Sequence, residues 1–380
     1  MKHTKTWGFS LVAALLLAAC GGGGSDTAPR ANITSVKVMG DSLADVGTFG
    51  FKFTVQGTAS LIYPERIAKT YGISSLCSFY LFNGTTFIAN PAAGCTDFAI
   101  GGGRINNPTA PTSPQTITLQ LQTASAAGNY SATDLLVIDG GGNDAADLVG
   151  AYLKAATDGG VAYSALLTTQ LSPTVVAANL GAGPSGFVAV GGLYMTALAD
   201  TFYAAIKTSV LDKGATHVAV VNVPGITKTP RFQMVLDSIA AANGGGTAGA
   251  TARAGAEAVF DGWVKAFNAE LASKFAGNAS VIVVDAYTGL NDEVAHPAQF
   301  GLSNVATPAC PITGVGTDGL PTYTFSTCTD AALSAAPPTG VTDANWWKTY
   351  LFADSFHPTP LGHQLLAELI SKSLATAGWL

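Results

Sequence analysis

The sequence predicts an α/β fold, a three-layer α/β/α sandwich in which helices cover both faces of a parallel sheet. Short aliphatic runs, such as 33–38 and 134–139, have the continuous apolar character of strands that are buried on both faces. Other segments carry an apolar residue at every third or fourth position, as from Met195 to Val210, which predicts amphipathic helices. Strands that alternate with such helices form βαβ units and a parallel sheet.

In the N-terminal half, turn and cap residues set the expected limits of the elements. A helix should open at Tyr63-Pro64, because proline is tolerated in the first turn, and should close at Gly72. Asn83-Gly84 predicts a two-residue hairpin turn between two short strands. A further strand is expected at 96–100, where it runs into three glycines.

Strands and helices continue to alternate in the C-terminal half. We expect helices at 194–211, around 260–271 and at 361–374, and strands at 217–223 and 281–285. Three stretches rich in Gly, Ala and Thr interrupt this pattern and are expected to be loops or insertions on one domain: 151–190, 240–255 and 306–345.

Composition excludes several classes of protein. Hydrophobic residues make up 48% of the 380 residues, too many for an intrinsically disordered chain. The net charge is −6 and no stretch is rich in Lys and Arg, which argues against a nucleic-acid-binding surface. The mean hydropathy of +0.33 would suit a membrane protein. However, the longest uncharged stretch, 159–199, is interrupted by prolines and glycines and contains no run of about 20 apolar residues.

The start of the chain predicts export. Lys2 and Lys5 precede a short apolar segment, which is the arrangement of a signal peptide over residues 1–19. Small residues directly before Cys20 resemble the lipobox of bacterial lipoproteins, in which the cysteine is acylated and becomes the first residue. An ordinary signal peptide with an incidental Cys20 is the alternative.

The lipoprotein interpretation also predicts how the rest of the chain is organised. Residues 20–30 would be a lipidated cysteine with a flexible, glycine-rich tether, and residues 31–380 a single domain with loop insertions. Gly21, rather than Asp, after the cysteine resembles the signal that sorts lipoproteins to the outer membrane; secretion is the alternative. Contact with a membrane is expected through the lipid anchor only.

Four cysteines remain after Cys20, an even number that suits disulfides in an oxidising compartment. Three pairings are possible, and we expect the local one, Cys77 with Cys95 and Cys310 with Cys328. The predicted hairpin would bring the first pair together. A zinc site is the competing interpretation, but neither Cys-x-x-Cys nor paired histidines support it, and we expect no metal.

Three clusters of glycine and polar residues follow directly after expected strands. They are Gly40-Asp41-Ser42, Gly101-Gly102-Gly103 and Gly141-Gly142-Asn143-Asp144. Ligands of open α/β sheets bind outside the carboxyl ends of the strands, so these clusters should meet at one functional edge. The glycines could indicate a phosphate loop, but the Lys-Ser/Thr of that loop is absent, and we expect no cofactor.

Ser42 is a candidate nucleophile if a base lies beside it. His357 has Asp354 three residues earlier, and on a turn of helix this spacing places both side chains on one side, so the carboxylate can orient the imidazole. His296, with Glu293 three residues earlier, has the same spacing and stays a competing base. Of the other histidines, His3 belongs to the expected signal peptide. His217 is expected at a strand start, as a packed or edge residue, and His363 is expected to face solvent on the last helix.

Taken together, four separated segments resemble the GDSL, or SGNH, hydrolase family of serine esterases and lipases. They are Gly40–Leu43, Phe98–Gly102, Gly141–Asp144 and Asp354–His357, in the family's order and spread over nearly all of the mature chain. The resemblance implies a parallel, flavodoxin-like sheet. Two details depart from the family pattern: Asp97 stands where the family usually has Asn, and a third glycine leaves the position of the following backbone donor open between Gly101 and Gly102.

The resemblance also implies roles for individual residues. Ser42 would attack an ester carbonyl, and His357, oriented by Asp354, would transfer the proton. The backbone N–H groups of Ser42 and Gly102 and the side-chain amide of Asn143 would form the oxyanion hole. Asp41 and Asp144 are expected to be structural residues that cap turns beside the site.

Three functions remain open at this point. The first is a carboxylic-ester hydrolase, an esterase or lipase that acts through an acyl-enzyme on a small-molecule or lipid ester. The second is an O-deacetylase of polysaccharide or peptidoglycan, for which Trp346-Trp347 could offer an aromatic sugar platform. The third is a non-catalytic surface lipoprotein that retains the fold for binding.

Overall fold

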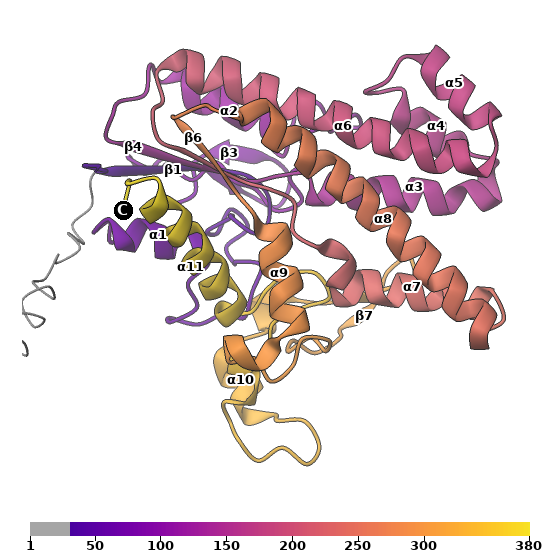
Figure 1. Cartoon of the computed structure of the whole chain (residues 1–380). Coiled ribbons are helices and arrows are strands. Elements are labelled where there is room, and N and C mark those ends of the chain that lie inside the picture. Colours follow the sequence, from indigo (N-terminus) through magenta and orange to yellow (C-terminus); the bar gives the residue numbers. More distant parts are fainter. Residues whose placement is uncertain (1–30) are drawn as a thin grey trace, which may run out of the picture.

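The computed structural model describes residues 31–380, so the expected signal peptide, Cys20 and the tether lie outside the described residues. Its central sheet has four parallel strands in the order β1-β4-β5-β6 (Figure 1). The strands are Ser35–Met39 (β1), Asp134–Ile138 (β4), Val218–Val221 (β5) and Val281–Val284 (β6). All four coincide with predicted strands, with ends that differ by one or two residues.

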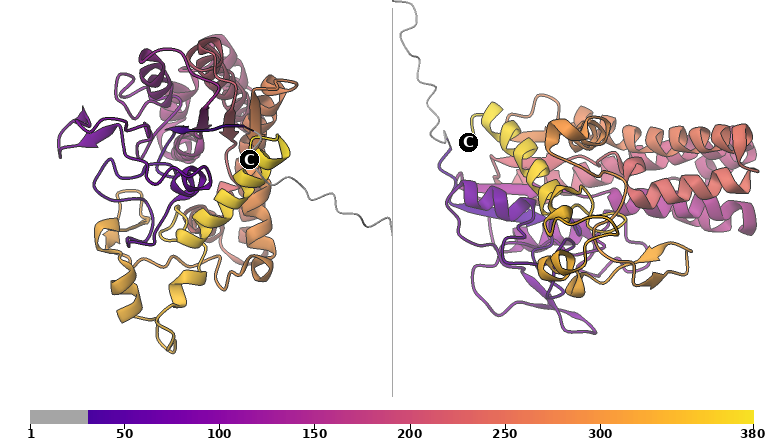
Figure 2. Two further views of the ribbon diagram at one scale, coloured as in Figure 1. Left: turned by 90° about the vertical axis from the view of Figure 1, so that its left-hand side faces the viewer. Right: turned by 90° about the horizontal axis from the view of Figure 1, so that it is seen from below.

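Side chains alternate between the two faces of the sheet and define two apolar cores. Val36 and Val38 of β1 face the helices α1 and α11, whereas Met39 faces the helices α2, α6 and α8. The sheet therefore lies between two helical layers, and the predicted three-layer sandwich is confirmed (Figure 2). The covering helices are Tyr63–Thr70 (α1), Pro360–Thr376 (α11), Ile117–Ala126 (α2), Pro184–Ser209 (α6) and Gly246–Phe275 (α8).

Helices also occupy two of the three stretches that we expected to be loops or insertions, so these two stretches are not loops. Residues 151–190 and 240–255 belong mainly to helices. Two of their glycines serve close packing: a Cβ at Gly186 would lie 1.9 Å from the Asn179 carbonyl oxygen, and a Cβ at Gly249 would lie 2.5 Å from the Ala240 carbonyl oxygen. The additional helices are Gly142–Asp158 (α3), Val161–Leu167 (α4), Pro173–Gly181 (α5) and Pro230–Ala242 (α7). They extend the molecule beyond one end of the sheet (Figure 1).

One helical segment of the described part, Pro184–Lys213, is long and apolar enough to cross a membrane by length and composition alone. Leu198, Phe202 and Ile206 on one of its faces are completely buried in the core on the α2, α6 and α8 side of the sheet, whereas Leu193 is 44% exposed. One face of the segment therefore packs into the core of this structure.

The segment 96–100 lies beside β1 but is not the regular strand that we predicted. Only Asp97 forms a bridge to Val38, supported by backbone hydrogen bonds on either side. The hairpin after α1 is present as Tyr80–Phe82 (β2) and Phe87–Ala89 (β3), but four residues connect its strands, not the expected two, because Phe82 pairs with Phe87. Cys77 and Cys95 form the expected disulfide at the base of this hairpin.

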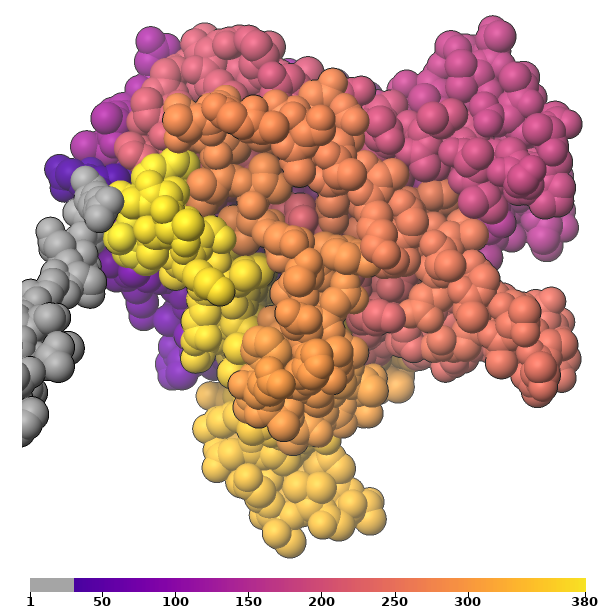
Figure 3. Space-filling view, viewed as in Figure 1, coloured from indigo at the N-terminus to yellow at the C-terminus, as the bar shows by residue number. Residues whose placement is uncertain are grey.

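Residues 306–345 form a lobe that projects from the body of the molecule (Figure 3). The second expected disulfide, Cys310–Cys328, holds the lobe together beside a small apolar cluster. The lobe is mostly loop, as predicted, and contains Gly314–Val315 (β7), Pro321–Thr322 (β8) and Asp330–Ala335 (α10). Helix Ala286–Ala295 (α9) lies before the lobe, and five short 3-10 helices complete the described elements: Leu211–Lys213, Ile226–Lys228, Pro297–Phe300, Phe325–Thr327 and Trp346–Thr349.

Candidate active site

Ser42 lies on the tight turn that follows β1, and this turn is held from several sides. The N–H of Asp41 donates to Asp139 Oδ1 (3.0 Å), and the N–H of Leu43 donates to Asp41 Oδ1 (3.0 Å). A Cβ at Gly40 would lie 1.7 Å from Asp139 Oδ1, so only glycine fits before the turn. Ser42 is 4% exposed, which places its hydroxyl at the base of a pocket.

His357 approaches Ser42 from the loop before α11. Its Nε2 lies 2.8 Å from Ser42 Oγ, and its Nδ1 lies 3.0 and 2.9 Å from the two carboxylate oxygens of Asp354. The two residues lie on a bend, not on the helical turn that we expected. Asp354 Oδ1 shapes this bend by accepting the N–H groups of Phe356 (2.8 Å) and His357 (2.6 Å).

The environment of Asp354 favours its ionised form. Burial acts to raise the pKa of this carboxyl, but the His357 ring and the backbone N–H donors outweigh burial, so the pKa lies below its usual value. An ionised Asp354 accepts the Nδ1–H of His357 and leaves Nε2 free to accept the hydroxyl proton of Ser42. The rings of Phe53 and Phe325 lie 5.2 and 5.5 Å from the His357 ring and limit the access of water to this side.

The glycine cluster after the 96–100 segment supplies one free backbone donor near Ser42. Gly101 donates its N–H to Asp45 Oδ2 (2.9 Å), and Gly103 donates to the Ile100 carbonyl (2.9 Å). Among the described residues, the N–H of Gly102 has no acceptor, and neither has the N–H of Ser42. Gly102 has φ 77°, a left-handed conformation that favours glycine. Of the two open positions, the geometry favours Gly102.

Asn143 lies in the first turn of α3, which follows β4, and its side chain reaches the surroundings of Ser42. Its Nδ2 donates to the Gly103 carbonyl (3.0 Å) and lies 3.4 Å from Asp41 Oδ2, so the amide is fixed beside the nucleophile turn. Arg104 Nη1 donates to the Gly102 carbonyl (2.7 Å) and is itself held by Asp147. These contacts orient the N–H of Gly102 and the amide of Asn143 before any ligand binds.

Several buried carboxyls support the site without facing it. Asp144 accepts the N–H groups of Ile105 (3.0 Å) and Asn106 (2.8 Å), and burial raises its pKa to about 7. Asp97, which replaces the expected Asn, accepts the N–H groups of Val46 and Ala99, and burial raises its pKa well above the usual value. Both carboxyls hold loops in place through these backbone donors.

The other candidate residues do not join this cluster. His296 is exposed at the end of α9, and no side-chain hydrogen bond links it to Glu293, which is buried. His217 is half-buried against the Trp379 ring. His363 is completely buried beside Tyr63, and burial lowers its pKa to about 3, so the predicted solvent-facing position is wrong.

The two tryptophans that could have offered an aromatic sugar platform are buried. Trp346 and Trp347 are 9% and 4% exposed and pack in the cluster beside the Cys310–Cys328 disulfide. The indole N–H of Trp346 donates to the Leu333 carbonyl (2.9 Å). These rings offer no face to a polysaccharide, so the structure does not favour the deacetylase alternative.

Sequence reasoning missed the residues that position the reacting groups. Asp139 and Tyr63 form a buried pair under the nucleophile turn, with the Tyr63 hydroxyl donating to Asp139 Oδ2 (2.8 Å). Gln120 bonds both backbone groups of Gly40, donating to its carbonyl (3.1 Å) and accepting its N–H (2.9 Å). Asp139 could have been noticed in the sequence, because it is a charged residue at the end of an apolar strand. Gln120 could not, because a glutamine on a helix carries no signal of a positioning role.

The comparisons with known proteins agree with this geometry. The family model described as GDSL-like Lipase/Acylhydrolase matches residues 36–370. A search of the curated proteins gave no match. Within residues 31–380, no group of three or more His, Cys, Asp or Glu side chains could hold a metal ion. The arrangement thus offers an activated hydroxyl and hydrogen-bond donors for a developing oxyanion.

Proposed function

Because this chain belongs to the family of GDSL-like lipases and acylhydrolases and is therefore a hydrolase of ester type, we propose that it cleaves carboxylic-acid esters by a serine mechanism. The observation that carries this proposal is the chain of contacts from Asp354 through His357 to Ser42, with 2.8 Å between His357 Nε2 and Ser42 Oγ. A serine hydroxyl is a weak nucleophile alone, and this contact provides the base that it needs.

In the first half of the reaction, Ser42 Oγ attacks the ester carbonyl carbon while its proton moves to His357 Nε2. The carbonyl oxygen becomes an oxyanion that accepts hydrogen bonds from the N–H groups of Ser42 and Gly102 and from the Asn143 amide. The intermediate then collapses, the carbon–oxygen bond to the alcohol breaks, and His357 donates its proton to the departing oxygen.

The acyl group is now bonded to Ser42 and must be removed by water. A water molecule attacks the acyl carbon while His357 takes its proton, and the same donors hold the second oxyanion. Collapse returns the proton to Ser42 Oγ and releases the carboxylic acid. Asp354 stays ionised throughout and stabilises the imidazolium that forms in each half.

We further propose that the enzyme acts in the cell envelope. Two disulfides are compatible with export. The lipobox-like sequence supports cleavage after residue 19 and a lipid anchor on Cys20, with residues 31–380 as one catalytic domain on a glycine-rich tether at the outer membrane. The substrate is then a small-molecule or lipid ester that reaches this compartment.

The test uses protein lacking residues 1–20 with p-nitrophenyl acetate, butyrate, octanoate and palmitate. We expect Ser42→Ala and His357→Ala to lose at least about a thousandfold in kcat, and His296→Ala, as the control, to retain normal activity. Wild-type protein that hydrolyses none of these esters, or a dead His296→Ala variant, would contradict the proposal.

A further inference from the structure

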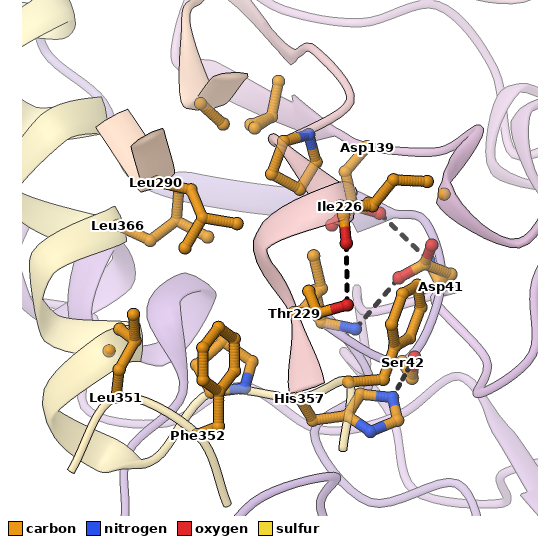
Figure 4. A pocket seen from close by; sticks show the side chains of 18 of the residues that line it. Asp41, Ser42, Asp139, Ile226, Thr229, Leu290, Leu351, Phe352, His357 and Leu366 are labelled. Atoms are coloured by element: carbon orange, nitrogen blue, oxygen red, sulfur yellow. Dashed lines mark hydrogen bonds between the residues drawn. The ribbon is translucent and has the colours of Figure 1, made fainter. Parts of the chain in front are cut away.

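An apolar cavity, open on one side, extends from the reacting pair into the space between α9 and α11. Ser42 and His357 lie on one side of this α9–α11 cavity, and Leu290, Leu351 and Leu366 lie on the other (Figure 4). The space inside its lining is about 890 Å³ when the open side is included.

Two spaces meet at His357. The α9–α11 cavity contains Ser42 in its wall, whereas a second, open and polar groove is lined by Arg104, Asn143 and Arg231. In the proposed reaction the acyl group stays bonded to Ser42 while the alcohol leaves and water enters. The apolar cavity therefore suits the acyl chain, and the polar groove suits the departing alcohol and the incoming water.

One residue in the wall of the cavity does not fit a purely apolar chain. Glu293 is 8% exposed, and its carboxyl makes no hydrogen bond or ion pair within the described part of the chain. On α9 it follows the buried Ala286 and the half-buried Leu290, and all three residues line the same cavity. A largely buried carboxyl without a protein partner depends on water or a ligand in the cavity for its hydrogen bonds.

The other polar groups in the wall are occupied. Thr229 Oγ1 donates to the Ile226 carbonyl (2.7 Å), and Asp139 accepts from Asp41 and Tyr63. No charged group faces Glu293, and burial alone raises its pKa to about 8. At neutral pH its carboxyl is therefore mostly protonated, and a protonated carboxyl can both donate to and accept from an uncharged polar group.

Resting on the proposed ester hydrolysis, we propose that the α9–α11 cavity binds the acyl chain of the substrate and that Glu293 recognises a hydroxyl group on that chain. The preferred substrates are then esters of hydroxy acids with an otherwise apolar chain. A hydroxyl satisfies both hydrogen-bonding functions of Glu293, whereas an unsubstituted chain leaves them unpaired. Sites that hydrogen-bond a substrate hydroxyl discriminate strongly against analogues that lack it.

The test compares p-nitrophenyl esters of terminally hydroxylated acids of eight, ten and twelve carbons, which are too long to cyclise readily, with their unsubstituted counterparts. The readout is the ratio of kcat/KM for the hydroxylated ester to kcat/KM for the unsubstituted ester. We expect Glu293→Leu to lower this ratio at least tenfold at one chain length, and Glu293→Gln, whose amide also donates and accepts, to keep it within about threefold. Asp292→Asn, an exposed carboxyl on the same helix, is the matched control and should leave the ratio unchanged.

A second variant tests the location of the chain independently. Leu366→Trp fills the α9–α11 cavity and should lower kcat/KM for octanoate at least tenfold more than for acetate. If wild type and Glu293→Leu hydrolyse esters with the same ratio of kcat/KM for hydroxylated and unsubstituted chains, the proposed role of Glu293 is overturned, but the acyl pocket is not. Equal losses on octanoate and acetate in Leu366→Trp would overturn the acyl pocket. Wild type that hydrolyses no ester would overturn the proposed function and this inference together.

Discussion

Replacing Asp354 by Asn should abolish most of the activity while leaving the local fold intact. Asp354 Oδ1 accepts two backbone N–H groups, from Phe356 and His357, and an asparagine can keep both with its carbonyl oxygen. Its amide nitrogen would then face His357 Nδ1 as a donor, in place of a carboxylate oxygen at 2.9 Å. The carbonyl oxygen also lies 3.0 Å from Nδ1, but it already accepts two backbone N–H groups, so the amide nitrogen becomes the main partner of Nδ1. The imidazole then accepts at Nδ1 and carries its proton on Nε2, which points at Ser42 Oγ.

In that tautomer His357 cannot accept the proton of Ser42, and the imidazolium loses its counter-ion. Losses of this kind in serine hydrolases are on the order of 10⁴-fold in kcat, or about 5.5 kcal/mol of barrier. The assay is p-nitrophenyl butyrate hydrolysis beside a thermal unfolding curve. Asp343→Asn is the control, because Asp343 also caps a turn (2.8 Å to the N–H of Asn345) but faces no histidine. An Asp354→Asn variant with more than a tenth of normal kcat would refute this reasoning.

Three further predictions concern the oxyanion donors, the hairpin and the buried acid. Asn143→Ala should lower kcat by about 10²–10³-fold with little change in KM, measured on the same ester, and an unchanged kcat would exclude the amide as an oxyanion donor. Removing the Cys77–Cys95 disulfide, which spans 18 residues, should lower the free energy of unfolding by about 3 kcal/mol in urea titrations; no change would contradict this. Because the pKa of Glu293 is raised from 4.5 to about 8, folded protein holds this proton more tightly than unfolded protein, so its stability falls as the pH rises from about 5 to 9. Glu293→Gln should remove about 4 kcal/mol of that fall, and an identical pH dependence would refute the assignment.

The elements that were predictable from sequence are those whose signal is local. The strand at 134–139 is a continuous apolar run because it is buried on both faces, and the motif residues lie at strand ends because parallel strands share one edge. The Ser42, Asp354 and His357 side chains meet as the motif spacing and the family resemblance implied.

The parts that were not predictable depend on contacts between distant segments. Glycines at 186 and 249 resemble loop residues in sequence, but they allow α6 and α8 to approach the neighbouring helices α5 and α7. Segment 96–100 has the composition of a strand, yet its neighbour β1 offers only one bridge. The burial of His363 follows from the way α11 packs toward Tyr63, which no local pattern reports.

The most direct test of the central claim is to identify the residue that forms the covalent intermediate. Protein lacking residues 1–20 would be treated with an alkyl fluorophosphonate, which reacts with activated serines, and analysed by intact mass and peptide mapping. The account predicts one adduct per chain, on Ser42, with no adduct in Ser42→Ala and a reaction at least a thousandfold slower in His357→Ala. An adduct on another residue, or ester hydrolysis that persists in an unlabelled Ser42→Ala variant, would contradict it.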